Sequence, residues 1–295
     1  MKRGRQFFLR ELVKKYIKDN NYGFLLFILD SLKLIRHGVD QDDCHGQKLF
    51  FKKEGSLLMG VYNNREIHSH ILNGGFESHI TKIMSNQIKQ GDVCIDVGAN
   101  IGFYSILMAE LSGPSGAVFA FEPVEYNRKK IQLNASLNGL KNITIVDKAL
   151  GDKSETLELN VYPEDSKLIG HHSFVINETL KNDQSFEKQL VDVVSIDEWL
   201  QTNNISHVDF VKVDIEGFEH SFFRGAKNLL EKNPIIFFEH SAQRIKELGI
   251  DESNFKVLLK GYTCYEILSD GLLEYNFDSD MHPYASDIMA IPKKN

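Results

Sequence analysis

Five apolar runs alternate with helix-like stretches from Val93 onward, and this alternation constrains the fold more than any other feature of the chain. The runs read "VCIDV", "AVFAFEP", "ITIVDKAL", "VDFVKVD" and "IIFFEH". The stretches between them include "FYSILMAEL", "NRKKIQLNASLNG" and "FEHSFFRGAKNLLEK". Strands that are apolar almost throughout are typical of a parallel sheet covered by helices on both faces. We therefore expect a doubly wound, mostly parallel α/β domain over residues 76–295.

Residues 1–75 precede this alternation and are expected to form an N-terminal extension. Apolar residues recur at helical spacing over residues 9–17 and again over residues 25–35, which predicts two amphipathic helices. The runs "KLFFKK" and "SLLMGVY" around Glu54 predict a hairpin, and "ESHITKIMSNQIKQ", at the start of the main domain, predicts a helix that leads into Gly91. Two interpretations of the N-terminal helices stay open. They pack as a cap on the main domain or on a second subunit of a homodimer, or they lie on a membrane surface.

The charge of the chain is unevenly distributed and excludes one class of substrate. The net charge is −7, yet residues 1–36 hold nine Lys or Arg against three Asp or Glu, so the rest of the chain is strongly acidic. An acidic body repels phosphates, which argues against nucleic acid as the main substrate. The basic arm predicts contact with an anionic surface. Three widely spaced cysteines without a CxxC pair indicate a reducing, cytoplasmic location.

The first apolar run ends at Asp96 and leads into a turn that is predicted to bind the ligand. The turn supplies Gly98, Ala99, Asn100 and Gly102, with the spacing Gly-x-Asn-x-Gly. Dinucleotide-binding folds have Gly-x-Gly-x-x-Gly instead. Glycine permits a positive φ, and asparagine is one of the few other residues that tolerate it. Because ligands of such sheets bind at the carboxyl ends of the strands, the turn should line the site.

Acidic residues at the strand ends indicate which ligand is bound. Asp96 would repel a pyrophosphate by about a few kcal/mol in a poorly solvated contact. S-adenosylmethionine has no phosphate and carries an ammonium and a sulfonium group, so an acid at this position suits it. Glu122 ends the second run, where an acid can accept hydrogen bonds from ribose hydroxyls. The third run ends near Lys148 and Ala149, which we expect to bracket the adenine ring.

Several motifs together resemble the FkbM-type S-adenosylmethionine-dependent methyltransferases. They are "DVGANIGFYS", "FEPVEYN", "LNASLNG", "VSIDEW" and "VKVDIEGFE", within residues 76–292. The resemblance implies a class I methyltransferase fold, which is Rossmann-like, and O-methylation, often of sugars or secondary metabolites. It also implies that the cofactor site includes Asp96, Gly98, Asn100, Gly102 and Glu122, with Asp214 in a signature after the fourth strand.

The candidate catalytic residues follow the fourth and fifth runs. Asp214 and Glu216 should lie at the sheet edge, one facing the cleft and the other capping the next helix. Glu239 and His240 end the next run at the same edge. Methyl transfer needs alignment of the reactants and no metal, and a base near a sugar hydroxyl assists it. We expect His240 or Asp214 to be this base. A divalent ion held by Asp214, Glu239 and His240 is the open alternative.

The polar segment 162–189 is long for a loop within a compact domain and is expected to lie over the site, with His171 and His172 near the acceptor. The predicted function is O-methylation of a saccharide or a related small-molecule or glycan acceptor, with S-adenosylmethionine as the cofactor. Two alternatives stay open. One is a methyltransferase-like module that binds without turnover, and the other is a nicotinamide-dependent oxidoreductase, which Asp96 and the turn spacing disfavour.

Overall fold

The computed structural model describes residues 41–42, 48–54, 57–62, 77–164, 166, 171–175, 185–241, 245, 249, 253–277 and 285–293. The two predicted N-terminal helices lie outside these residues, so the membrane and homodimer interpretations stay predictions. Within the described part of the chain, no helix combines the length and the apolar character that a membrane crossing requires.

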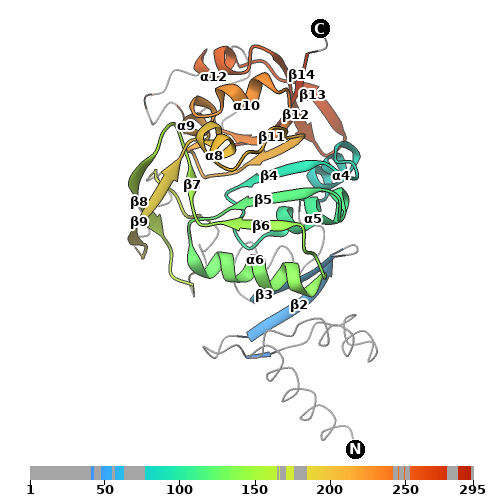
Figure 1. The fold of residues 1–295 in the computed structure, drawn as a ribbon, viewed down its shortest axis with the longest axis vertical. Coiled ribbons are helices and arrows are strands. Elements are labelled where there is room, and N and C mark those ends of the chain that lie inside the picture. The colour runs from blue at the N-terminus through green and yellow to red at the C-terminus, as the bar shows by residue number, and fades with distance from the viewer. Residues whose placement is uncertain are drawn as a thin grey trace, which may run out of the picture.

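The described residues form a central sheet of eight strands in the order β13-β12-β14-β11-β10-β4-β5-β6 (Figure 1). The strands are β4 (Val93–Val97), β5 (Ala117–Phe121), β6 (Ile143–Val146), β10 (Phe210–Val213), β11 (Ile235–His240), β12 (Tyr262–Leu268), β13 (Gly271–Glu274) and β14 (Ser286–Pro292). Each of the five predicted apolar runs contributes a strand to this sheet, although the end of the third run, Ala149–Leu150, belongs to a smaller sheet.

The strand order reverses between β4 and β10, and this reversal places the ligand site. The chain builds outward from β4 through β5 to β6, then returns to the other side of β4 as β10 and continues to β11. These five strands are parallel to one another, and β14 runs antiparallel between β11 and β12. The predicted doubly wound, class I methyltransferase fold is thereby confirmed. Ligands of such sheets bind where the order reverses, beyond the carboxyl ends of the strands.

Helices cover both faces of the sheet because side chains alternate along each strand. One face carries α4 (Ser78–Gln87), α5 (Phe103–Ser112) and α6 (Glu125–Leu137). The other carries α8 (Ile196–Thr202), α9 (Glu219–Arg224), α10 (Lys227–Glu231) and α12 (Ser253–Leu258). On β4, Cys94 packs toward the first face, whereas Ile95 and Val97 pack toward the second. The same alternation decides which strand-end residues reach the site.

The stretch "FEHSFFRGAKNLLEK" was expected as one helix and forms two, α9 and α10. Gly225 ends α9 at a point where the chain approaches the segment after β7. A Cβ atom on Gly225 would lie 2.1 Å from the Gly151 carbonyl oxygen, so only glycine fits there. The close approach interrupts the helix and was not visible in the apolar pattern.

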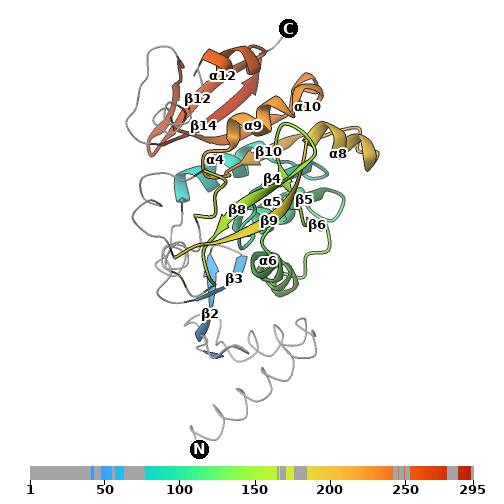
Figure 2. The same ribbon diagram turned by 90° about the vertical axis from the view of Figure 1, so that its left-hand side faces the viewer.

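Two smaller sheets lie beside the central one. Strands β7 (Ala149–Leu150), β8 (Glu155–Val161) and β9 (Glu187–Val194) form a sheet in the order β7-β9-β8, at the left of Figure 1 and in front in Figure 2. The predicted polar segment is thus the connection between β8 and β9. The predicted hairpin is confirmed as β2 (Lys48–Glu54) and β3 (Leu57–Tyr62), joined by β1 (Gln41–Asp42). Strand β3 contacts α5 and α6.

Candidate active site

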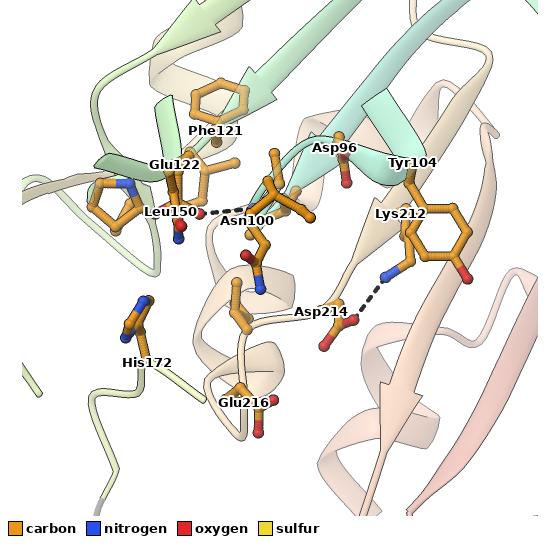
Figure 3. A pocket seen from close by; sticks show the side chains of 18 of the residues that line it. Asp96, Asn100, Tyr104, Phe121, Glu122, Leu150, His172, Lys212, Asp214 and Glu216 are labelled. Carbon is orange, nitrogen blue, oxygen red and sulfur yellow. Dashed lines mark hydrogen bonds and ion pairs between the residues drawn. The ribbon is translucent and has the colours of Figure 1, made fainter. Parts of the chain in front are cut away.

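A cavity of about 330 Å³ opens at the carboxyl ends of β4, β5, β10 and β11, where the sheet order reverses (Figure 3). This volume lies within the range of small-molecule binding sites. Figure 3 shows Glu122 and His172 at one side of the cavity and Lys212 and Asp214 at the other. Among the described residues, the lining contains two histidines, one lysine and six acids. The lysine is Lys212, and the acids are Glu77, Asp96, Glu122, Asp214, Glu216 and Glu239. Such a lining favours cations and hydroxyl donors over anions.

The backbone N–H groups of the turn after β4 already donate hydrogen bonds to residues at the end of β5. Those of Gly98 and Ala99 both donate to the Phe121 carbonyl oxygen at 3.0 Å. The N–H of Asn100 donates to Glu122 Oε2 at 2.8 Å. A phosphate-binding turn directs such N–H groups at its ligand. This turn therefore offers little to a pyrophosphate, in agreement with the sequence argument.

The same turn packs tightly against the end of β10. Gly98 has a φ of 78°, and a Cβ atom there would lie 2.0 Å from the Asp214 carbonyl oxygen. Asn100 has a φ of 50°, as predicted for a residue that replaces a middle glycine. Gly98, Ala99 and Asn100 line the cavity. Gly102 does not, because it precedes α5 and packs against Ile131.

Glu122 is held in place by two backbone groups on the side of the cavity formed by β5. It is 4% exposed, and its oxygens accept hydrogen bonds from the N–H groups of Asn100 and Val124, each at 2.8 Å. Burial raises the pKa of this carboxyl to about 7, although the hydrogen bonds oppose the shift. A carboxylate fixed in this way is a preorganised acceptor for hydroxyl groups of a ligand.

Asn127 on α6 lines the cavity beside Glu122 and was missed by sequence reasoning. The side chain is fully buried and contributes to lowering the pKa of Glu122. Even so, neither its nitrogen nor its oxygen reaches hydrogen-bond geometry with a partner in the described structure. A buried polar group without a partner costs about 1–3 kcal/mol, so a ligand that pairs with it gains correspondingly. The sequence "FEPVEYN" contained Asn127, but nothing in it separated this residue from an ordinary helix position.

Asp96 is buried within the sheet edge, as its position on β4 dictates. It is 2% exposed, and Ser105 on α5 donates a hydrogen bond to its Oδ2 at 2.5 Å. Burial raises the pKa of Asp96, and the positive charge of Lys212 opposes this shift. Lys212 is the direct neighbour of Asp96 in the β4–β10 register.

Lys212 connects the acidic groups of the sheet edge and was also missed from the sequence. Its Nζ donates to Asp214 Oδ2 at 2.8 Å and lies 4.4 Å from the centroid of the Tyr104 ring (Figure 3). The Tyr104 hydroxyl in turn donates to the carboxylate of Glu77. Burial alone would lower the pKa of Lys212, but the negative charges of Asp214, Glu77 and Asp96 outweigh it and raise the pKa. Lys212 therefore stays charged.

Asp214 and Glu216 both line the cavity, which corrects the expectation that one of them caps the next helix. Helix α9 has no side-chain cap, and its first residue, Glu219, accepts hydrogen bonds at Oε1 from the N–H groups of Ile215 and Gly217 in the preceding turn. Glu216 has a φ of 53°, a left-handed conformation that a non-glycine residue seldom adopts. This conformation places Glu216 next to Asp214 at the cavity.

The insertion between β8 and β9 lies at the cavity, as predicted, through His171, His172 and Phe174. The Tyr162 N–H donates to His172 Nδ1 at 3.1 Å, and the Tyr126 hydroxyl lies 2.5 Å from Nε2. Burial lowers the pKa of His172 to about 3, so the ring is neutral and anchors the insertion. His171 is instead half-exposed, with Nδ1 at 3.3 Å from Glu216 Oε1.

The expectation that His240 is the catalytic base is wrong, because the side-chain alternation of β11 directs it away from the cavity. Glu239 lines the cavity, but His240 lies on the opposite face, 2% exposed. Its ring packs against Phe255, Phe277 and Tyr275, with centroid distances of 5.0, 5.1 and 5.6 Å. For the same reason, His240 cannot join Asp214 and Glu239 as a ligand of the alternative divalent-ion site. No group of three metal-ligating side chains occurs in the described ranges.

Of the segment that is expected to bracket the adenine ring, only part reaches the cavity. Ala149 lines the cavity together with Leu150. Lys148 does not, because its ammonium group forms a surface ion pair with Asp192 at 3.4 Å.

A known protein family matches the part of the chain that forms most of this site. The family model described as "Methyltransferase FkbM domain" matches residues 96–268. This range begins at Asp96 and includes the turn, Glu122, the insertion and the end of β10.

Three curated relatives are similar to parts of the chain. They are "Methyltransferase 1" of Beauveria bassiana, at 26% identity over 44% of this chain, "Hexuronic acid methyltransferase AglP" of Haloferax volcanii, at 22% over 69%, and "31-O-demethyl-FK506 methyltransferase FkbM" of Streptomyces tacrolimicus, at 24% over 48%. The matches span 57%, 74% and 62% of the lengths of these relatives.

Replacing Lys212 with methionine tests its role at the acidic edge. We expect Lys212→Met to lower the free energy of unfolding by about 3 kcal/mol, since removing the buried ammonium group leaves the buried Asp96 carboxylate without its counter-charge. The loss should be larger at pH 8 than at pH 6, because the buried carboxyls, whose pKa the change raises further, are more fully ionised at pH 8. Urea unfolding at both pH values measures this. Lys148→Met, which removes a surface pair, should change stability by less than about 1 kcal/mol. Equal losses of stability in Lys212→Met and Lys148→Met would contradict the role of Lys212 at the acidic edge.

Proposed function

The chain belongs to the FkbM methyltransferase family, and we propose that it transfers a methyl group from S-adenosylmethionine to a hydroxyl group of a saccharide or a related small polyhydroxylated acceptor. The observation that carries the proposal is the single cavity in which an acidic sheet edge, a turn with satisfied N–H groups and an unpartnered buried amide meet. The names of two relatives, a hexuronic acid methyltransferase and a 31-O-demethyl-FK506 methyltransferase, support an acceptor that bears oxygen.

The residues of the cavity fit this cofactor. Glu122 offers acceptors for ribose hydroxyl groups, and Asn127 offers a donor and an acceptor beside it. Ala149 and Leu150 supply apolar contact for an adenine ring. Asp96 contributes negative charge toward a cationic ligand. When bound, S-adenosylmethionine supplies an electrophilic methyl group on a positively charged sulfur.

Asp214 is the proposed base that accepts the proton of the acceptor hydroxyl. It lies at the cavity just beyond β10, and its side chain is 39% exposed, so an acceptor can reach it. The hydrogen bond from Lys212 fixes the orientation of the carboxylate. Glu239 lines the same cavity and is the second candidate for this role. Proton transfer by a positioned carboxylate typically contributes about 10²–10⁴-fold to the rate.

A nicotinamide cofactor fits the cavity less well. The N–H groups that would bind a pyrophosphate already donate to Phe121 and Glu122. The buried acid at Asp96 adds repulsion at the same turn. This second candidate function therefore has no observation in its favour.

Ligand binding separates the two cofactors. We expect S-adenosylhomocysteine, but not NAD or NADP, to raise the melting temperature, because a ligand that binds the native state stabilises it by mass action. Asn127→Ala should weaken S-adenosylhomocysteine binding about tenfold in calorimetric titration, because it removes hydrogen bonds to the ligand. Asn228→Ala, an exposed position on α10, is the matched control and should bind normally. Stabilisation by NAD alone would refute the proposal.

The affinity for S-adenosylhomocysteine should depend on pH through Glu122. The pKa of the free carboxyl is about 7, and ribose hydroxyl donors favour its ionised form. Below pH 7 the group must lose a proton on binding, so affinity should fall about tenfold between pH 8 and pH 6. Calorimetry in buffers of different ionisation enthalpy measures the released proton. Glu122→Gln should abolish this dependence and Glu125→Gln, an exposed neighbour, should retain it. A flat profile in the unmodified protein would show that Glu122 does not meet the ligand.

Turnover identifies the base. Asp214→Asn should lower kcat by about 10²–10⁴-fold while S-adenosylhomocysteine affinity changes by less than about threefold. His240→Phe should keep near-normal kcat, since His240 packs among aromatic rings outside the cavity. Radiolabelled methyl transfer to a saccharide acceptor provides the measurement. Full activity in Asp214→Asn would rule out this residue as the base and direct attention to Glu239.

A further inference from the structure

The cavity has a side that the proposed cofactor contacts do not use. Its lining comes from the segment after β10, from Glu239 on β11 and from the insertion. We call Asp214, Glu216, Glu239 and His171 the acceptor edge. In Figure 3, Asp214 and Glu216 lie across the cavity from Glu122 and its neighbours.

The charges of the acceptor edge limit what can bind there. Three of its four residues are acids. Apart from Lys212, the described lining of the cavity contains no lysine or arginine. Lys212 already pairs with Asp214 at 2.8 Å, and His171, a cation only when protonated, already lies 3.3 Å from Glu216. In the described part of the lining, an anionic ligand would therefore meet carboxylates and no available counter-charge.

A neutral polyol meets the opposite situation at the same residues. Ionised carboxylates only accept hydrogen bonds, and every hydroxyl group of a sugar can donate one. An amino group on the sugar would add an ion pair. The cavity also suits a polar ligand, since both polar side-chain atoms of Asn127, which is fully buried in its lining, lie outside hydrogen-bond geometry with any described residue.

Glu216 is fixed in a way that suits recognition of the acceptor. Its φ of 53° is a conformation that costs about 1–3 kcal/mol and that concentrates at functional sites. Ser173 of the insertion donates a hydrogen bond to its carbonyl oxygen at 2.8 Å, and His171 contacts its carboxylate. The insertion thus holds both the backbone and the side chain of one acid at the cavity.

We propose that the methyl acceptor is an uncharged or amino-bearing polyhydroxylated molecule, that sugar acids and phosphorylated sugars are rejected, and that Glu216, oriented by His171, is a residue that enforces this choice. The inference rests on the proposed function and narrows its acceptor class. It follows from the charge of the acceptor edge and from the pairing of Lys212 with Asp214 and of His171 with Glu216.

Matched glycosides test this acceptor class. The probes are the 4-nitrophenyl glycosides of glucose, glucosamine and glucuronic acid, and the same three for galactose, each assayed for transfer of a radiolabelled methyl group. We expect the neutral or the amino member of a series to be methylated with a kcat/KM at least tenfold above that of the uronic acid. Equal or preferred use of the uronic acid would overturn the inference and leave the proposed function standing.

The remaining outcomes are distinguished by cofactor binding and by a variant. If S-adenosylhomocysteine binds but no glycoside is methylated, the saccharide acceptor itself is wrong, and this inference falls with it. If S-adenosylhomocysteine does not bind, the proposed function fails first.

Glu216→Gln should lower kcat/KM for the preferred acceptor at least tenfold and narrow its advantage over the uronic acid at least threefold. Glu158→Gln, an exposed acid on β8, is the control and should change neither value. An unchanged preference in Glu216→Gln would overturn the role of this residue.

Discussion

The site depends on one ion pair, between the buried Lys212 and the partly exposed Asp214, at the point where the sheet order reverses. Lys212 lies inside an otherwise apolar strand, yet it stays charged because Asp96, Asp214 and Glu77 surround it. Its ammonium group also contacts the Tyr104 ring and fixes the Asp214 carboxylate. One positive charge thereby allows several carboxylates to share a small cavity without prohibitive repulsion. An acidic edge of this kind suits a cationic cofactor and a hydroxylated acceptor.

The backbone of the turn after β4 supports the same conclusion independently of charge. In dinucleotide-binding folds the N–H groups of this turn and the following helix receive the pyrophosphate. Here the N–H groups of Gly98, Ala99 and Asn100 are used by Phe121 and Glu122. The turn thus serves to hold the acid at Glu122 in position. A fold that is shared with dinucleotide enzymes is adapted to a different ligand by a few hydrogen bonds.

The sequence was sufficient for features that depend on local pattern and insufficient for those that depend on register. Alternation of strands and helices predicted the sheet, and Asp96 and Glu122 followed from their positions at strand ends. His240 was misassigned, because its face depends on the phase of β11 relative to the helices that cover the sheet. Lys212 was missed, because its partners come from β4, α5 and the start of α4, which only the folded chain brings together. Asn127 was missed because its lack of a partner is a property of packing.

A crystal structure with S-adenosylhomocysteine tests the central claim most directly, that the acidic edge around Lys212 is a cofactor site. The account predicts that the ribose hydroxyl groups contact Glu122, that the adenine lies against Ala149 and Leu150, and that the sulfur faces Asp214. It also predicts that the Lys212–Asp214 pair persists with the ligand bound. Ligand density outside this cavity, or a ribose without contact to Glu122, would contradict the account.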